Sequence, residues 1–255
     1  AFFRWWASIV LASLPYVTAG AFAAGLARRI APRGGLVAMA FAMLAPGCDC
    51  AVSGYADAFA RGSPAIAGFA LAWSAAAGPA ALVATRAVLG THLLLARLAG
   101  AAVAAALTAI AWNAERTRWN RSGASACRSR TALVDDDRLD HGLLERVASG
   151  IFAVSASALS ATALVSSGTH VLHALASPVA AAAAGAILSP CSTADAVLAR
   201  VLLHDPPAQA AFVIAAQCVD VRQLATIARA VGARFAALAA IAGIAGCATA
   251  ALVAR

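Results

Sequence analysis

The sequence predicts an all-α, polytopic membrane protein with about eight transmembrane segments in two repeats, each repeat holding a broken or re-entrant cysteine-containing helix. Composition is the first reason. Hydrophobic residues make up 62% of the 255 residues and charged residues only 12%, and the mean hydropathy is +0.82, far from the values of soluble domains. The second reason is that the apolar residues fall in bilayer-length runs. The third is an internal similarity between the two halves of the chain.

The apolar runs define the predicted elements in chain order. The first half contains expected spans at 5–31, 66–90 and 91–112, with a broken segment at 34–61. The second half contains expected spans at 143–176, 208–231 and 234–254, with a broken segment at 178–204. The run at 5–31 is too long and has too basic a C-terminal flank for a cleaved signal peptide, so it is expected to span the membrane. Because the chain begins at Ala1 without a methionine, further sequence is expected to precede it.

Charge divides the chain into a first repeat (1–112), a polar linker (113–142) and a second repeat (143–255). The net charge of +8 comes from arginine alone, because the chain has no lysine. Arginines between apolar runs are topology signals rather than a nucleic-acid surface. We therefore expect a multi-pass protein of the bacterial plasma membrane, with the lipid bilayer as its partner, a cytoplasmic linker and no nucleic-acid partner. A homo-oligomer is compatible with this interpretation.

The two halves are related by a constant offset. Aligning Cys48 with Cys191 gives 191 − 48 = 143, and the same offset pairs three further residues: Pro64 with Pro207, Phe69 with Phe212, and Arg86 with Arg229. Internal repeats are how many secondary transporters are built, with the substrate site at the repeat interface. If the broken segments are re-entrant, the repeats are inverted, which agrees with the excess of arginine around the first broken segment. If they cross fully, the repeats run parallel.

Both broken segments combine proline, cysteine and an acid within apolar sequence. The first reads Pro46-Gly-Cys-Asp-Cys and the second Pro190-Cys-Ser-Thr-Ala-Asp. Such breaks free backbone groups that lipid cannot satisfy, so they persist only where they line protein or a cavity. The expected substrate-binding residues here are Cys48, Asp49, Cys50, Cys191, Ser192, Thr193 and Asp195. Ser192 or Thr193 can cap the following half-helix, and a thiol at such an end favours the thiolate that binds soft metals.

Cys218 and Asp220 complete the predicted site. They lie in the third apolar run of the second half and align with Ala75 and Ala77 of the first. Intramembrane acids are costly and therefore functional by default, so Asp49, Asp195 and Asp220 are expected to couple protons or to compensate a cation. Cys127 and Cys247 lie away from the breaks, and we expect them to serve packing only.

The two cysteine motifs, at matching depth in the two halves, resemble those of predicted permeases related to organoarsenical efflux permeases. The resemblance covers most of the chain outside the linker and includes Arg61-Gly-Ser-Pro and Gly78-Pro79. It departs at Gly78, where the family has asparagine, and at Gln217-Cys-Val-Asp, where proline and asparagine are usual. The resemblance implies a permease, and efflux of a trivalent organoarsenical would suit Cys48, Cys50 and Cys191 as contact ligands. Zinc or copper(I) would suit the same thiolates.

The resulting expectation is a permease without enzyme activity or cofactor, which exports a small thiol-reactive solute or soft metal(loid) ion through a cavity between the repeats. No phosphate-binding GxxxxGK[ST] motif is present, so coupling to an ion gradient or a partner is expected. The alternative is a transmembrane thiol-disulfide oxidoreductase that forms a transient Cys48–Cys191 disulfide. A membrane scaffold without transport is a third alternative, against which the broken helices argue.

Overall fold

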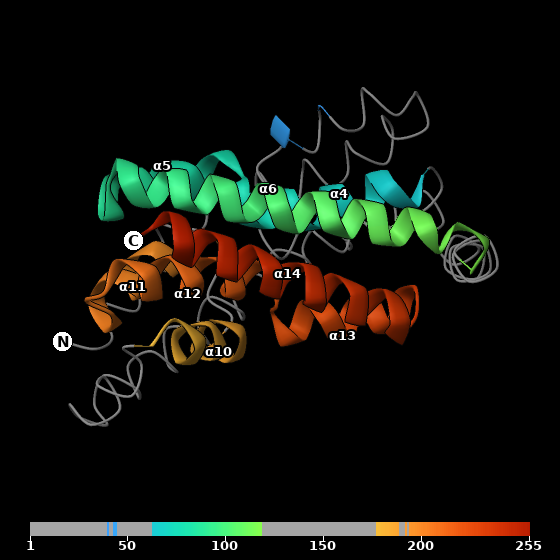
Figure 1. Cartoon of the computed structure of the whole chain (residues 1–255). Coiled ribbons are helices and arrows are strands. Elements are labelled where there is room, and N and C mark those ends of the chain that lie inside the picture. The colour runs from blue at the N-terminus through green and yellow to red at the C-terminus, as the bar shows by residue number, and fades with distance from the viewer. Residues whose placement is uncertain (1–39, 41–42, 45–62, 119–176, 189–191, 193) are drawn as a thin grey trace, which may run out of the picture.

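A computed structural model describes residues 40, 43–44, 63–118, 177–188, 192 and 194–255. Every element within these ranges is a helix. The first group is α4 (Pro64–Ala77), α5 (Pro79–Leu89) and α6 (Thr91–Ala114). The second group is α10 (Pro178–Leu188), α11 (Ala194–Leu202), α12 (Pro206–Cys218), α13 (Val221–Ala230) and α14 (Ala233–Val253). Figure 1 shows the helices of the two groups lying along a common long axis.

Four helical segments of the described chain are long and apolar enough to cross a bilayer, namely Pro64–Leu89, Thr91–Ala114, Pro206–Arg229 and Ala233–Val253. Their ends agree to within two residues with the spans predicted at 66–90, 91–112, 208–231 and 234–254. Large apolar side chains also point outward, as membrane helices require, and Val83, Ile110 and Ile241 are each more than 60% exposed. The chain is thus an all-helical membrane protein in its described part. The predicted span 143–176 lies outside the described residues, as do 5–31 and all but a few residues of 34–61.

Two of the predicted spans are each made of two helices rather than one. Gly78 separates α4 from α5, and Pro79 begins α5 at a position where a missing N–H costs nothing. In the other span, Asp220 separates α12 from α13, because its carboxylate accepts a hydrogen bond from Arg222 N at 2.7 Å and caps the new helix. These interruptions leave the last carbonyls of α4 and α12 available to other partners.

Glycines make the sharp connections into the two longest helices. Gly90 joins α5 to α6 with φ of 89°, and Gly232 joins α13 to α14 with φ of 123°. Glycine adopts these positive φ values without the steric cost that other residues carry. Both connections therefore let the following helix begin directly beside the one before it.

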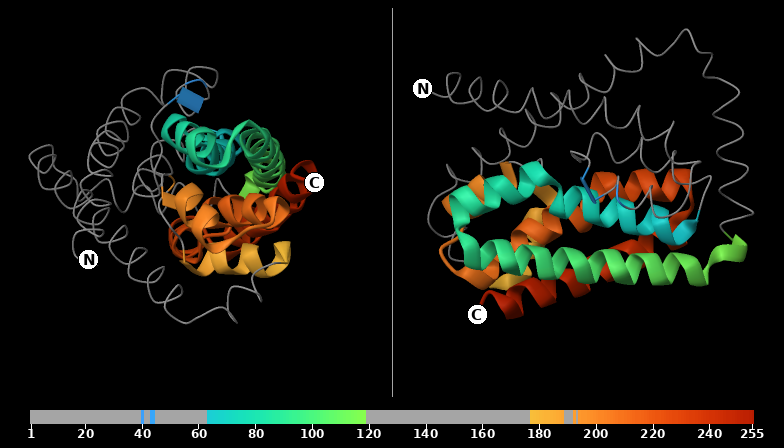
Figure 2. Two further views of the ribbon diagram at one scale, coloured as in Figure 1. Left: turned by 90° about the vertical axis from the view of Figure 1, so that its left-hand side faces the viewer. Right: turned by 90° about the horizontal axis from the view of Figure 1, so that it is seen from above.

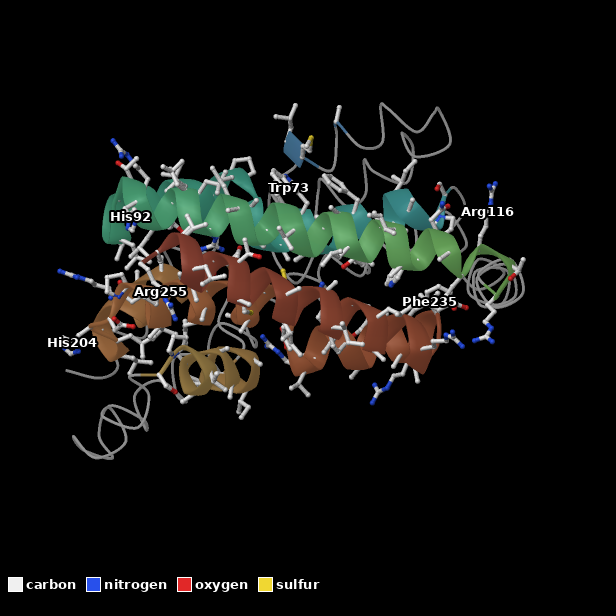
Figure 3. All side chains as sticks on the ribbon, viewed as in Figure 1. Trp73, His92, Arg116, His204, Phe235 and Arg255 are labelled. Atoms are coloured by element: carbon white, nitrogen blue, oxygen red, sulfur yellow. The ribbon has the colours of Figure 1, made fainter. Side chains whose placement is uncertain are left out.

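The long helices α6 and α14 pack side by side in opposite directions. Figure 3 shows His92, at the start of α6, at the same end of the bundle as Arg255, whereas Arg116 and Phe235 lie at the other end. The indole N–H of Trp112 donates to the Phe235 carbonyl oxygen at 3.1 Å, and the two rings meet edge to face at 5.5 Å. The left view of Figure 2 shows α4 and α5 in the upper part of the bundle and α10 to α12 in the lower part.

The packing between α6 and α14 is as close as backbones allow. A Cβ atom added to Gly100 would lie 2.7 Å from the Gly246 carbonyl oxygen, and one added to Gly246 would lie 2.7 Å from the Gly100 carbonyl oxygen. Most of the surrounding core is alanine. Small residues at a helix interface are the usual means of close packing in membranes, where burial of apolar surface provides little driving force.

Candidate functional site

A buried ion pair lies where the two groups of helices meet. Arg97 of α6 and Asp195 of α11 are both fully buried and are paired through two bonds, Nη1 to Oδ1 at 2.9 Å and Nη2 to Oδ2 at 2.7 Å. This bidentate geometry is the strongest form of contact between these two side chains. The pair joins residues 98 positions apart, so it links the helices before the linker to those after it.

Arg97 also makes contacts that depend on the break between α4 and α5. Its Nε donates to the Ala76 carbonyl oxygen at 2.6 Å, and its Nη1 donates to Thr85 Oγ1 at 2.8 Å. Ala76 lies in the last turn of α4, where carbonyls have no partner within the helix and carry the negative end of the helix dipole. The interruption at Gly78-Pro79 thus presents an acceptor to which the buried arginine donates.

Asp195 accepts a third hydrogen bond, from a side chain of α12. Gln217 Nε2, near the end of α12, donates to Oδ2 at 3.0 Å. Asp195 lies in the first turn of α11, as the sequence predicted, and an acid is favourable there because it faces the positive end of the helix dipole. Because α11 begins beside the end of α12 and leads through a short connection to its start, the two helices form an antiparallel pair.

The network includes a charged residue inside a helix that is long and apolar enough to cross a bilayer. Arg97 follows the first residue of α6 by six positions, which corresponds to about 9 Å along the helix. A charge at this depth is costly and is found in membrane proteins mainly where it is paired inside the bundle. The side chains of Arg97, Asp195, Thr85 and Gln217 are all buried, so the bundle itself encloses the pair.

The structure also describes three other predicted site residues, and none of the hydrogen bonds of Arg97 and Asp195 given above involves them. Ser192 is buried just before α11. Cys218 is buried, and its Sγ lies 3.8 Å from the Ala72 carbonyl oxygen of α4. Asp220 caps α13 and lies 3.4 Å from the half-exposed Arg222 side chain. Asp220 therefore has a local structural task as the N-cap of α13.

Five predicted site residues lie outside the described part of the chain: Cys48, Asp49, Cys50, Cys191 and Thr193. The soft-metal contacts assigned to Cys48, Cys50 and Cys191 stay predictions for this reason. Within the described residues, no group of three or more His, Cys, Asp or Glu side chains could hold a metal ion. Cys247, expected to serve packing, is buried in the helical core.

Sequence reasoning singled out Asp195 but missed its partner Arg97. The signal was present, because the rule that an intramembrane charge is functional by default applies equally to an arginine within the run 91–112. Thr85 and Gln217 carried weaker signals, since uncharged polar residues are common in membrane helices. Comparison of the chain with protein-family models, with curated proteins and with solved structures gives no match.

Proposed function

We propose that the protein is a membrane permease that moves a small thiol-reactive solute or soft metal(loid) ion through a passage between its two halves. The single observation that carries this proposal is the buried Arg97–Asp195 pair. Buried charges in membrane proteins mark substrate or ion pathways more often than they serve packing alone. This one lies beside helix interruptions and between the halves of the chain, where secondary transporters place their sites.

We further propose that the halves are inverted repeats. The offset of 143 relates α4 to α12, and each is followed by a break, a short helix, a glycine with positive φ and a long helix. The long helices α6 and α14 run in opposite directions, as equivalent helices of inverted repeats do. The offset also pairs Ser74 with Gln217, two buried polar residues that precede equivalent breaks.

Inverted repeats predict that the starts of α4 and α12 face opposite sides of the membrane. Single cysteines at Ser63 and His204, in a background without native cysteines, should react with a membrane-impermeant maleimide from opposite sides. Arginines gather at the end of the bundle that holds Arg116, which is also the end where α4 begins. Because arginine-rich ends stay in the cytoplasm, Ser63→Cys should be labelled from the cytoplasm. Labelling of both cysteines from one side would contradict the inverted arrangement.

The thiol-seeking cargo rests on the cysteine motifs and on the resemblance that they carry. Two proline-cysteine breaks in corresponding positions are expected to bring Cys48 and Cys191 to one passage. Thiolates bind trivalent arsenic, copper(I) or zinc. The direction that suits a toxic cargo of this kind is efflux from a bacterial cell.

Growth of an arsenical- and metal-sensitive bacterial host tests the cargo. The wild-type protein should raise the tolerated concentration of methylarsenite or of a soft metal ion several-fold, and the Cys48→Ser, Cys191→Ser variant should not. Cys247→Ser is the matched control, because this cysteine is buried in the helical core and belongs to neither cysteine motif of the sequence. Equal tolerance with and without the protein, for every solute tested, would exclude this cargo class. A Cys48–Cys191 disulfide that cycles with a redox partner would instead support the oxidoreductase alternative.

A further inference from the structure

The guanidinium group of Arg97 is surrounded by oxygen atoms from three separate elements. The Ala76 carbonyl of α4 contacts Nε, the Thr85 hydroxyl of α5 contacts Nη1, and the Asp195 carboxylate of α11 contacts both terminal nitrogens. These contacts measure 2.6 to 2.9 Å. The Thr85 hydroxyl hydrogen is directed to the Ala81 carbonyl oxygen at 2.8 Å, so its oxygen presents lone pairs toward Arg97.

These oxygen atoms are of the kinds that coordinate a hard monovalent cation. A carbonyl at a helix break, a hydroxyl and a carboxylate are all oxygen ligands, and transporters coordinate Na⁺ with unwound carbonyls and half-helix ends. Soft metals prefer sulfur and imidazole ligands, and the contacts of Arg97 include neither. A carboxylate partner alone would require only the Nη1–Nη2 edge of the guanidinium. The additional contacts at Nε and on the far side of Nη1 make an oxygen cradle, formed by Ala76, Thr85 and Asp195.

We propose that the Arg97 guanidinium is a built-in cation, which permanently fills a monovalent-cation site formed by this oxygen cradle. The tethered charge compensates Asp195 without any ion from solution. One consequence rests on the permease function proposed above: transport should not require Na⁺ at this position. The other consequence is independent of transport, because removal of the guanidinium should convert the cradle into a site for a dissolved cation.

The test uses the purified full-length protein in detergent micelles and measures its apparent melting temperature. Arg97→Ala is compared in NaCl, KCl and choline chloride at equal concentration, so that ionic screening is constant and only cation size differs. We expect Na⁺ or K⁺ to raise the melting temperature of the variant by about 3–6 °C over choline at roughly ten times the dissociation constant. The rise should saturate with concentration. The Arg97→Ala, Asp195→Asn double variant, which lacks the cradle's charge, should show none.

The same measurement on the wild-type protein does not depend on whether a variant is stable. The wild-type melting temperature should be the same in all three salts, because its site is already filled. A specific gain from Na⁺ or K⁺ in wild type would contradict the proposal, as would an Arg97→Ala protein with no response to either ion.

Arg97→Gln is the second variant in case Arg97→Ala accumulates poorly, and it should also respond to Na⁺ or K⁺. Cells contain K⁺ at high concentration, so at least one of the two single variants should accumulate. If neither accumulates while Arg97→Ala, Asp195→Asn does, no cation fills the cradle and the proposal is overturned. None of these readouts requires transport, so failure of the cation site and failure of the permease function are distinguishable.

Discussion

Replacing Asp195 with alanine should strongly destabilise the protein. Removal of one partner leaves the fully buried Arg97 guanidinium without its carboxylate, and loss of one member of a buried pair costs about 3–5 kcal/mol. The apparent melting temperature in micelles should fall by about 6–20 °C. Thermal unfolding of the purified variant measures this fall.

Asp220→Ala is the matched control for this variant. Asp220 is also a buried aspartate, but it caps α13 and its arginine neighbour Arg222 has a side chain that is 44% exposed. Loss of an N-cap costs about 0.5–2 kcal/mol, and no buried charge is left unpaired. The Arg97→Met, Asp195→Leu double variant should regain much of the lost stability, because apolar residues of similar size often replace a buried pair at little cost. Equal losses for Asp195→Ala and Asp220→Ala would contradict the structural importance of the Arg97–Asp195 pair.

Valine at Gly246 should separate the two longest helices. A Cβ atom there would lie 2.7 Å from the Gly100 carbonyl oxygen and 2.9 Å from the Ala104 Cβ, and neither neighbour is the end of a flexible side chain. Forcing extra atoms into a packed core costs about 1–3 kcal/mol, and the contact with backbone places this variant at or above the upper end. Thermal unfolding measures the loss.

Ala248→Val is the control for Gly246→Val, because it makes a similar change on the same helix at an exposed position. It should leave the melting temperature close to that of wild type. If Gly246→Val were equally silent, the close approach of α6 and α14 would not exist in the membrane.

The four described spans could be predicted from the sequence because hydropathy follows from the bilayer itself. A stretch such as Thr91–Ala114 must be helical in lipid, since no other single segment satisfies its own backbone groups. The predicted ends agree with the structure because glycine and proline mark them, as at Gly90 and Pro206. The interruption at Val219-Asp220 was less visible, because it depends on a side-chain cap rather than on proline.

The site could be predicted only in part. Hydropathy is a property of each residue by itself, whereas a site depends on which side chains contact each other in the fold. Asp195 was recognisable as a charge in apolar sequence, and so was Arg97, but their pairing depends on how α6 and α11 pack across the two halves. Asp220 shows what the sequence did not reveal, because its carboxylate caps a helix in the structure, while its role in ion coupling stays a prediction. The offset of 143 predicted related halves, whereas Arg97 itself has alanine at its counterpart, Ala240.

The central claim, that a thiol-seeking solute crosses the membrane through this protein, is tested most directly by flux. Purified protein in proteoliposomes should carry methylarsenite, or one of the soft metal ions tested, across the bilayer at a rate that empty liposomes do not match. The Cys48→Ser, Cys191→Ser variant should lose this flux and Cys247→Ser should keep it. Flux that is indistinguishable between wild-type proteoliposomes and empty liposomes, with folded protein verified by its melting transition, would contradict the account.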